Sequence, residues 1–296
     1  MDKNNIIGII ADDLRQIYLA KYLSELGYSV QIITTENYDN IKYTINLEKC
    51  YFLSDIYDLI GSSNVIVTPI PFIKMNNLMN LNDFIFNISK KENLDEFLLY
   101  AGQIEEHSVN QLNSYNIKYM DYYKSESLTI FNTIATAEGI IAEAIINKNT
   151  NLHNSNVLIL GFGKCAKTLA HKLKGIGAKV TVCATNKTDL SIAESLGYNT
   201  LCLHNLIMSI SEYNYIFNTI PTLILEKNLL SKMKSDTLIL DIASAKGGVD
   251  KEFADNHGIK VIHSLGIPGK YSAKSSGIAL GDDLLKYISD IILDSA

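Results

Sequence analysis

A glycine-rich turn near the middle of the chain carries the most specific chemical signal in this sequence. The apolar run 157–160 leads directly into Gly161-Phe162-Gly163-Lys164-Cys165-Ala166, and helical sequence follows. In such a turn the first glycine permits a sharp change of direction, the second admits a pyrophosphate close to the backbone, and a small third residue lets the helix pack on the strand. The helix N-terminus adds N–H groups and a positive dipole. The motif predicts a dinucleotide-binding turn formed by Gly161, Phe162, Gly163, Lys164 and Cys165.

The residues after the next predicted strand, 179–184, indicate which dinucleotide binds. An Asp or Glu at this position would bond the ribose 2′-hydroxyl of NAD. Here Ala184 is followed by Thr185, Asn186 and Lys187. A hydroxyl, an amide and a cation without a carboxylate favour a 2′-phosphate, so NADP is preferred to NAD. Lys187 fits a solvated loop lysine equally well.

Two further strand ends carry polar residues. Ligands of doubly wound sheets bind beyond the carboxyl ends of the strands, so these positions are candidates for cofactor contacts. One is Asn218-Thr219-Ile220-Pro221, which we expect beside the nicotinamide ribose, and the other is Asp241-Ile242-Ala243-Ser244, which precedes a tight turn at 245–248. The cofactor-binding residues expected here are Asn218, Thr219, Pro221, Asp241 and Ser244.

The single arginine of the chain, Arg15, follows the first predicted strand within Ala11-Asp12-Asp13-Leu14-Arg15-Gln16. A guanidinium presents a planar fork to a carboxylate, which a lysine cannot do, so Arg15 is a candidate for binding a substrate carboxylate. Asp12 or Asp13 is suited to cap the helix that follows.

A third group of candidate site residues lies just before, or in the first turn of, a helix predicted from Ala135 to Asn147. We expect Asn132 and Thr136 near the N-terminal end of this helix, where they would face a cleft and bind substrate. Glu138 is a candidate for moving a proton. It also fits a first-turn acid that only balances the helix dipole.

Strands alternate with helical stretches almost throughout, which is typical of parallel α/β architecture. Five strands are predicted in each half, and those of the first half suit a flavodoxin-like or half-Rossmann sheet. In the first half the predicted strands are 6–10, 30–34, 65–70, 97–100 and 117–119, and in the second they are 157–160, 179–184, 215–218, 237–241 and 260–263. A helix is predicted at 15–26, and a last one, on an apolar helical period, from Gly277 onward.

The predicted organisation is two Rossmann-like domains with parallel sheets and the active site in the cleft between them. Residues 1–130 form a substrate domain of flavodoxin or Rossmann type, and residues 131–296 form the NAD(P)-binding domain. By analogy with two-domain dehydrogenases, the C-terminal helix 277–296 packs back on the first domain.

Composition excludes several classes of partner. Lys and Arg total 26 against 32 Asp and Glu, a net charge of -6, which removes the usual electrostatic basis for binding nucleic acid or anionic lipid. We expect no membrane span and no signal peptide, and therefore a cytoplasmic protein. The spacing of the four cysteines and six histidines predicts reduced structural thiols and no metal site.

With these segments in place, the chain resembles the dipicolinate synthase A family over nearly its whole length. The most specific pieces are 11–16, 132–139, 161–166, 218–221, 241–248, Gly266-Ile267-Pro268-Gly269, and Ala273-Lys274-Ser275-Ser276-Gly277. The chain departs from the family pattern at Ala166, where a third glycine is usual, and at Thr185, where an arginine is usual. The second departure leaves recognition of a 2′-phosphate to Lys187 or Lys164.

The resemblance implies oxidation of dihydrodipicolinate, or of its hydroxylated precursor, to pyridine-2,6-dicarboxylate with NADP. It also implies a flavoprotein-like second subunit, an oligomer, and the mother-cell cytoplasm during sporulation. The two substrate carboxylates would then meet Arg15 and Lys274, assisted by Ser275, Ser276 and a helix N-terminus. Glu138 or Asp241 would take the ring proton or dehydrate the precursor, and Lys274 completes the catalytic set.

Two alternatives stay open. One is a dehydrogenase for a 2-hydroxy or amino acid on the same two-domain plan. The other is a cofactor-binding subunit without turnover of its own, whose catalysis resides in the partner.

Overall fold

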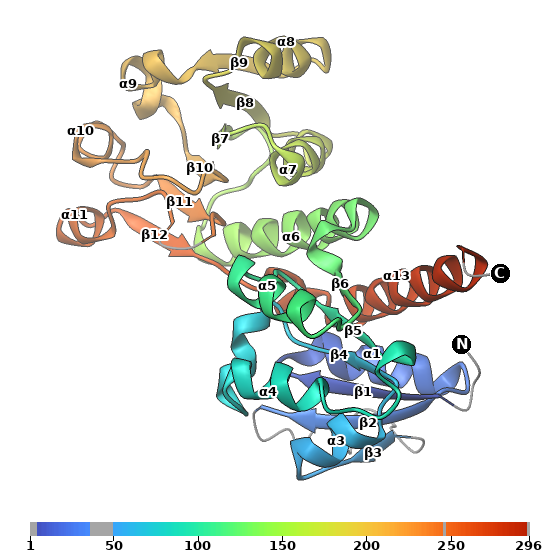
Figure 1. The fold of residues 1–296 in the computed structure, drawn as a ribbon. Coiled ribbons are helices and arrows are strands. Elements are labelled where there is room, and N and C mark those ends of the chain that lie inside the picture. Colours follow the sequence, from blue (N-terminus) through green and yellow to red (C-terminus); the bar gives the residue numbers. More distant parts are fainter. Residues whose placement is uncertain (1–4, 36–49, 245–246, 295–296) are drawn as a thin grey trace. The chain divides into compact units, whose positions relative to one another are not determined.

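The computed structural model describes residues 5–35, 50–244 and 247–294. Contacts between Cα atoms divide the chain into two compact units. The first unit consists of residues 1–131 together with 272–296, and the second of residues 132–271. The chain therefore leaves the first unit within one helix and returns to it just before the last helix (Figure 1).

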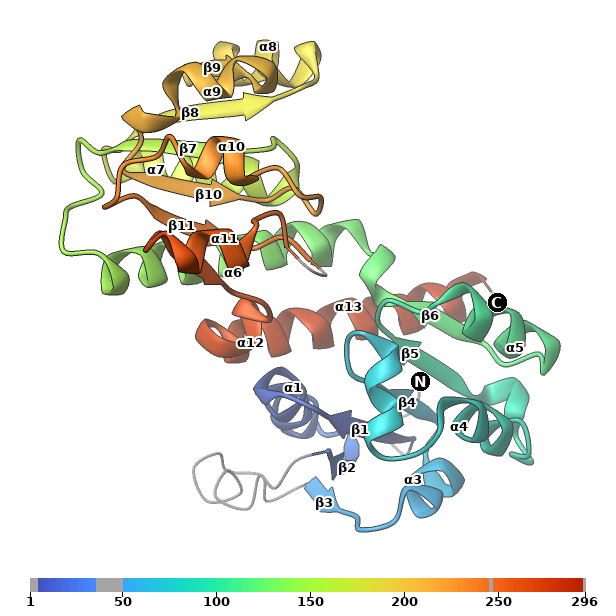
Figure 2. The same ribbon diagram turned by 90° about the vertical axis from the view of Figure 1, so that its left-hand side faces the viewer.

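The first unit is built on a parallel sheet of six strands in the order β3-β2-β1-β4-β5-β6. The strands are β1 (Ile6–Ala11), β2 (Ser29–Thr34), β3 (Cys50–Phe52), β4 (Val65–Val67), β5 (Leu98–Ala101) and β6 (Tyr119–Asp121). The helices are α1 (Leu14–Glu25), α3 (Ile56–Ser62), α4 (Leu81–Ile88), α5 (Glu106–Ser114), the first part of α6 (Glu126–Asn147), and α13 (Ala273–Asp294). Helices α1 and α13 cover one face of the sheet, and α3, α4 and α5 cover the other (Figure 2).

The second unit repeats this plan with strand order β12-β11-β10-β7-β8-β9. Its strands are β7 (Asn156–Leu160), β8 (Lys179–Ala184), β9 (Asn199–Cys202), β10 (Tyr215–Asn218), β11 (Leu238–Asp241) and β12 (Lys260–His263). Its helices are α7 (Lys164–Gly175), α8 (Lys187–Ser195), α9 (Leu206–Ser209), α10 (Lys227–Leu230), α11 (Lys251–Asn256) and α12 (Ile267–Tyr271). Helices α6 and α7 bury one face, and α9, α10 and α11 bury the other. Short 3-10 turns are η1 (Phe72–Asn77), η2 (Leu94–Glu96), η3 (Tyr122–Lys124), η4 (Leu203–Asn205) and η5 (Ile210–Glu212).

Both sheets have the strand order of dinucleotide-binding folds, which confirms two Rossmann-like sheets and excludes the flavodoxin-like order for the first. The five-strand prediction was wrong for each half because β3 and β9 are short edge strands. Half of the residues of β9 are polar, and β3 has only three residues, so neither produces a strong strand pattern.

Helix boundaries differ from the prediction at both points where the chain passes from one unit to the other. Helix α6 begins at Glu126 rather than Ala135, more than two turns earlier. Its first turns expose Ile130 and Phe131, so they lack a one-sided apolar pattern, and the β-branched residues there have weak helix propensity. Helix α13 begins at Ala273 rather than Gly277. Residues 267–271, for which no helix was predicted, form the short helix α12.

Helices α1 and α13 approach each other closely at Gly277, where a side chain would not fit. A Cβ built at Gly277 would come within 2.5 Å of the Arg15 carbonyl oxygen in α1. Four residues further on, Gly281 lies against Tyr22 in the same way, so α1 and α13 pack side by side with their N-termini together.

Candidate dinucleotide and substrate sites

In the second unit the strand order reverses at β7 and β10, and the crevice beyond their carboxyl ends is where ligands of such sheets bind. Gly161 follows β7 with φ +94°, a conformation that favours glycine, and its N–H donates to the Cys183 carbonyl at 2.8 Å. A Cβ on Gly161 would stand 2.6 Å from Thr219 Oγ1. The sharp turn expected of the first glycine is therefore present and leaves no room for a side chain.

Gly163 is the N-cap residue of α7, and no described side chain caps this helix. A Cβ built on Gly163 meets nothing within 4 Å, so the space beside its backbone is open. Ala166 is fully buried in the core between α7 and the sheet. An uncapped helix N-terminus that faces open space suits the pyrophosphate of a dinucleotide.

The remaining residues of the turn divide between core and surface. Phe162 is buried, and its ring packs edge-on against that of Tyr198, with 6.3 Å between the ring centroids. Only the backbone of Phe162 is therefore placed to contact a dinucleotide. Cys165 is half-buried, and burial raises the pKa of its thiol. Lys164 is exposed at the start of α7.

The end of β8 presents three exposed residues, Thr185, Asn186 and Lys187, after the buried Ala184. Asn186 Oδ1 accepts the N–H of Thr188 at 2.8 Å and caps α8. Thr185 and Lys187 remain at the surface beside this cap.

Asn218 and Asp241 form a buried clip across the ends of β10 and β11. Asn218 Nδ2 donates to Asp241 Oδ1 at 2.9 Å, and the Asp241 carboxylate also accepts the backbone N–H groups of Ala243 and Gly248. Thr219 Oγ1 donates to the Leu160 carbonyl at 2.8 Å. These side chains hold the strand ends and the backbone of Ala243 and Gly248 in place, so their contacts are structural.

Two other predicted cofactor residues, Pro221 and Ser244, are exposed beyond the same strands. The neighbours of Ser244, residues 245–246, lie outside the described residues.

In the first unit Arg15 stands at the carboxyl end of β1, and its neighbour Asp13 caps α1 in a reciprocal capping box with Gln16. Arg15 Nε donates to both carboxylate oxygens of Asp13, at 3.0 and 2.9 Å. Burial opposes the charged guanidinium, but the hydrogen bond and the charge of Asp13 outweigh it and raise the pKa of Arg15. The guanidinium therefore stays charged, with one carboxylate already beside it.

The first turn of α13 carries Lys274, Ser275 and Ser276. Ser276 is 2% exposed, and its hydroxyl has no hydrogen-bond partner among the described residues. It precedes Gly277, which contacts Arg15, so the structure brings Ser276 to the N-terminus of α1. Ser275 instead lines an open groove of about 540 Å³ with Phe131 and Asp282, and Lys274 is exposed.

Asn132, Thr136 and Glu138 lie within α6 instead of at its N-terminal end, which corrects their expected placement. Thr136 Oγ1 donates to the Asn132 carbonyl at 2.9 Å, a bond within the helix. Glu138 pairs with Lys172, in the last turn of α7, at 2.8 Å. This pair is at the opposite end of α7 from Gly163, so Glu138 is remote from the dinucleotide turn.

A group of residues around Glu143 was missed by the sequence reasoning. Glu143 is buried, and its Oε1 accepts hydrogen bonds from Ser264 at 2.6 Å and Tyr271 at 3.0 Å. These residues come from α6, the end of β12 and α12, and no local motif links them.

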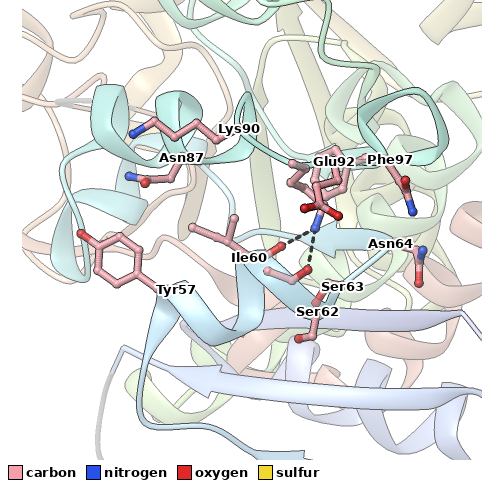
Figure 3. A pocket seen from close by; sticks show the side chains of 12 residues that line it. Tyr57, Ile60, Ser62, Ser63, Asn64, Asn87, Lys90, Glu92 and Phe97 are labelled. Atoms are coloured by element: carbon pink, nitrogen blue, oxygen red, sulfur yellow. Dashed lines mark hydrogen bonds between the residues drawn. The ribbon is translucent and has the colours of Figure 1, made fainter.

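A cavity of about 440 Å³ opens beside the amino ends of β4 and β5 in the first unit (Figure 3). In it Lys91 Nζ donates to the carbonyls of Ile60 and Gly61 and so terminates α3. Burial lowers the pKa of Lys91. The cavity is far from the carboxyl ends of the strands, and the role of Lys91 in it is structural.

Of the described helices, only α6 is long and apolar enough to cross a membrane, and 44% of its apolar window is buried in the protein. Its buried residues pack on the second sheet.

Comparison with known proteins agrees with these features. Residues 144–296 match the family model of the alanine dehydrogenase/PNT C-terminal domain. The A-subunit of dipicolinate synthase from Bacillus subtilis (strain 168) is 27% identical over 292 residues, which are 96% of each chain. The crystal structure of the dipicolinate synthase A-subunit from Bacillus halodurans has a TM-score of 0.80 at 25% identity, over 96% of this chain and 97% of that one.

A more distant likeness shows the fold alone: the transhydrogenase from Sinorhizobium meliloti has a TM-score of 0.66 at 13% identity, over 97% of this chain and 94% of that one. Together these likenesses confirm the resemblance inferred from the motifs.

Proposed function

Because this chain belongs to the alanine dehydrogenase/PNT C-terminal domain family, we propose that it is an NADP-dependent oxidoreductase that converts dihydrodipicolinate, or its hydroxylated precursor, to pyridine-2,6-dicarboxylate. The observation that carries the proposal is the pair Gly161 and Gly163. The first has a positive φ and no room for a side chain, and the second opens on empty space at an uncapped helix N-terminus. The turn therefore fits a dinucleotide.

The dinucleotide, when bound, accepts a hydride, and loss of this hydride and a proton makes the substrate ring aromatic. Because aromatisation favours the step, the protein has mainly to orient the donor carbon and requires no strong base. The contacts of Asp241 and Glu138 agree with this, since one is buried in a structural clip and the other pairs with Lys172.

In the proposed substrate site, Arg15 and Ser276 receive one carboxylate. Arg15 is charged and planar, and Asp13 already accepts hydrogen bonds from its Nε and from one terminal nitrogen, Nη2, so its other terminal nitrogen is the group proposed to meet the substrate. The Ser276 hydroxyl is buried and has no partner among the described residues, a costly state that a bound carboxylate would relieve. Lys274, in the same helical turn, supplies a second positive charge.

NADP is the proposed dinucleotide because no acid follows β8 before Asp189. Thr185 and Lys187 are exposed there and available to a 2′-phosphate. Replacing Thr185 by arginine should tighten NADP binding relative to NAD, because a guanidinium binds phosphate through two donors. Calorimetry with both dinucleotides measures this ratio, and an unchanged ratio would place the 2′-phosphate elsewhere.

We further propose that the chain acts in the mother-cell cytoplasm during sporulation, in a complex with a flavoprotein-like second subunit. The second subunit is supported by the likeness to a protein whose name marks it as one subunit of a synthase.

The decisive experiment measures binding of NADP and NAD to the purified chain, then reduction of NADP by dihydrodipicolinate, with and without the co-purified second subunit. Binding together with turnover supports the proposal. Binding without turnover, even in the complex, would favour a 2-hydroxy or amino acid dehydrogenase, to be tested on a substrate panel. Turnover only in the complex would show that this chain needs its partner. The absence of any binding would refute the proposal.

A further inference from the structure

Gln103, in the first unit, has a backbone conformation that its residue type rarely adopts. Its φ is +57°, in the left-handed region, where glycine and asparagine are common and glutamine is not. Such a conformation costs free energy and persists only where neighbouring groups enforce it. Residues held in this way are concentrated at binding and catalytic sites, which makes Gln103 a candidate for such a role.

A buried carboxylate enforces this conformation. Asp121, at the end of β6, is 5% exposed and accepts the backbone N–H groups of Gln103 at 2.8 Å and Ile104 at 3.3 Å. The preceding residue, Gly102, is fixed as well, because its carbonyl accepts the N–H of Phe72 at 2.8 Å. The backbone on both sides of Gln103 is therefore held in place.

The side chain of Gln103 has no structural role among the described residues. It is exposed, and its amide forms no hydrogen bond with them. It does not cap α5, because the N-cap residue of that helix is Glu105 and no described side chain caps it. The amide of Gln103, which can both donate and accept hydrogen bonds, is thus available to a ligand.

Gln103 lies at the same end of the first sheet as Arg15. It closely follows β5, and the strand order of this sheet reverses between β1 and β4, so ligands are expected beyond these carboxyl ends. Tyr122 connects the two positions. A Cβ built on Gly102 would stand 2.7 Å from the Tyr122 hydroxyl oxygen. Burial raises the pKa of Tyr122, and the nearby charge of Arg15 opposes this shift.

We propose that Gln103 is a substrate-contact residue, whose side-chain amide donates a hydrogen bond to a carboxylate of the pyridine dicarboxylate bound beside Arg15. This inference rests on the proposed function. A dicarboxylate has four acceptor oxygens, and Asp13 already accepts from two of the three guanidinium nitrogens of Arg15, so further donors are needed. A fixed backbone also limits the freedom that the Gln103 side chain loses on binding.

Two variants that separate the backbone from the amide test the inference. Gln103→Gly removes both the amide and the backbone strain, whereas Gln103→Met removes only the amide and keeps a side chain of similar length. Calorimetry on the full chain measures the Kd for pyridine-2,6-dicarboxylate, and steady-state kinetics measure the substrate KM. We expect both variants to raise both constants about three- to tenfold, the effect of losing one hydrogen bond. Only Gln103→Gly should raise the melting temperature.

Asn116→Gly is the matched control. Asn116 also has a positive φ, +55°, but it precedes β6, at the amino end of the sheet. Its replacement should leave both constants within about twofold of the wild type. The dinucleotide Kd should be unchanged in all three variants, because both residues belong to the unit without the glycine turn.

Normal dicarboxylate binding by either Gln103 variant would overturn the inference. A defect in Gln103→Gly alone would assign the effect to the backbone, and a wild-type chain that binds no dicarboxylate would leave Gln103 without a ligand; both results count against the proposal. If the wild type binds no dinucleotide, the proposed function fails, and the calorimetric comparison with the dicarboxylate still decides the role of Gln103.

Discussion

Gly161 lies directly against Thr219: a Cβ built on the glycine would stand 2.6 Å from the threonine Oγ1, which itself donates to the carbonyl of Leu160. The contact joins the ends of β7 and β10 at the point where the strand order reverses. The glycine turn therefore both shapes the proposed pyrophosphate site and belongs to the packing of the sheet edge.

Gly161→Ala should lower both stability and dinucleotide affinity. The backbone at Gly161 has φ +94°, which costs an alanine about 1–3 kcal/mol before the clash with Thr219 is added. Thermal unfolding measures the first effect and calorimetry the second.

Gly163→Ala is the matched comparison in the same turn. Its Cβ would meet no protein atom within 4 Å, so the fold should be unaffected, while the methyl group would enter the space proposed for the pyrophosphate. We expect a normal melting temperature and at least tenfold weaker NADP binding, on the order of 1.4 kcal/mol. Unchanged affinity would mean that the phosphates do not bind at Gly163.

Asp241→Asn should destabilise the second unit by about 1–3 kcal/mol, because an amide in place of the carboxylate would face at least one buried N–H donor. The midpoint of urea denaturation measures the change. Asp236→Asn is the control, since its side chain is 64% exposed and its carboxylate lies 3.4 Å from Lys148 Nζ. Equal shifts for the two variants would contradict the structural role of the Asp241 clip.

Arg15→Lys should reduce kcat/KM for the dicarboxylate on the order of tenfold or more, since a buried charged hydrogen bond is worth about 1.5–3 kcal/mol. NADP affinity should stay the same, because Arg15 belongs to the unit without the glycine turn. Lys21→Ala, on the same helix, removes only an exposed pair with Glu25 and should change neither constant. Unaltered kinetics of the Arg15 variant would remove this residue from the site.

Cys183 should make the free energy of unfolding depend on pH in the alkaline range. Burial first, and then the neighbouring Cys202, raises the pKa of the Cys183 thiol from 9.0 to about 12. The folded chain therefore holds a proton that the unfolded chain releases. The stability from this thiol is complete below pH 9 and is lost as pH rises toward 12, by at most about 1.4 kcal/mol per pH unit. Comparing urea midpoints of wild type and Cys183→Ala across this range isolates the effect, and parallel curves would argue against it.

Much of the architecture follows from local pattern. The run 157–166 specifies a strand, a tight turn and a helix because each requires residue types at fixed spacing, and the structure has all three in order. Alternating strands and helices likewise specify parallel sheets, because parallel strands need a crossover of about a dozen residues or more, which is usually a helix. The edge strands β3 and β9 escaped detection because few residues face a core there.

The roles of individual side chains depended on tertiary contacts. Asn218, Thr219 and Asp241 occupy positions typical of ligand contacts, yet neighbouring strand ends turn their polar atoms toward one another. Glu143 and Tyr271 are far apart in the sequence, and only the packing of α12 on α6 joins them. Periodicity and turn chemistry act over a few residues and are legible in sequence. Which donor meets which acceptor is decided by segments that folding brings together, and no local pattern contains that information.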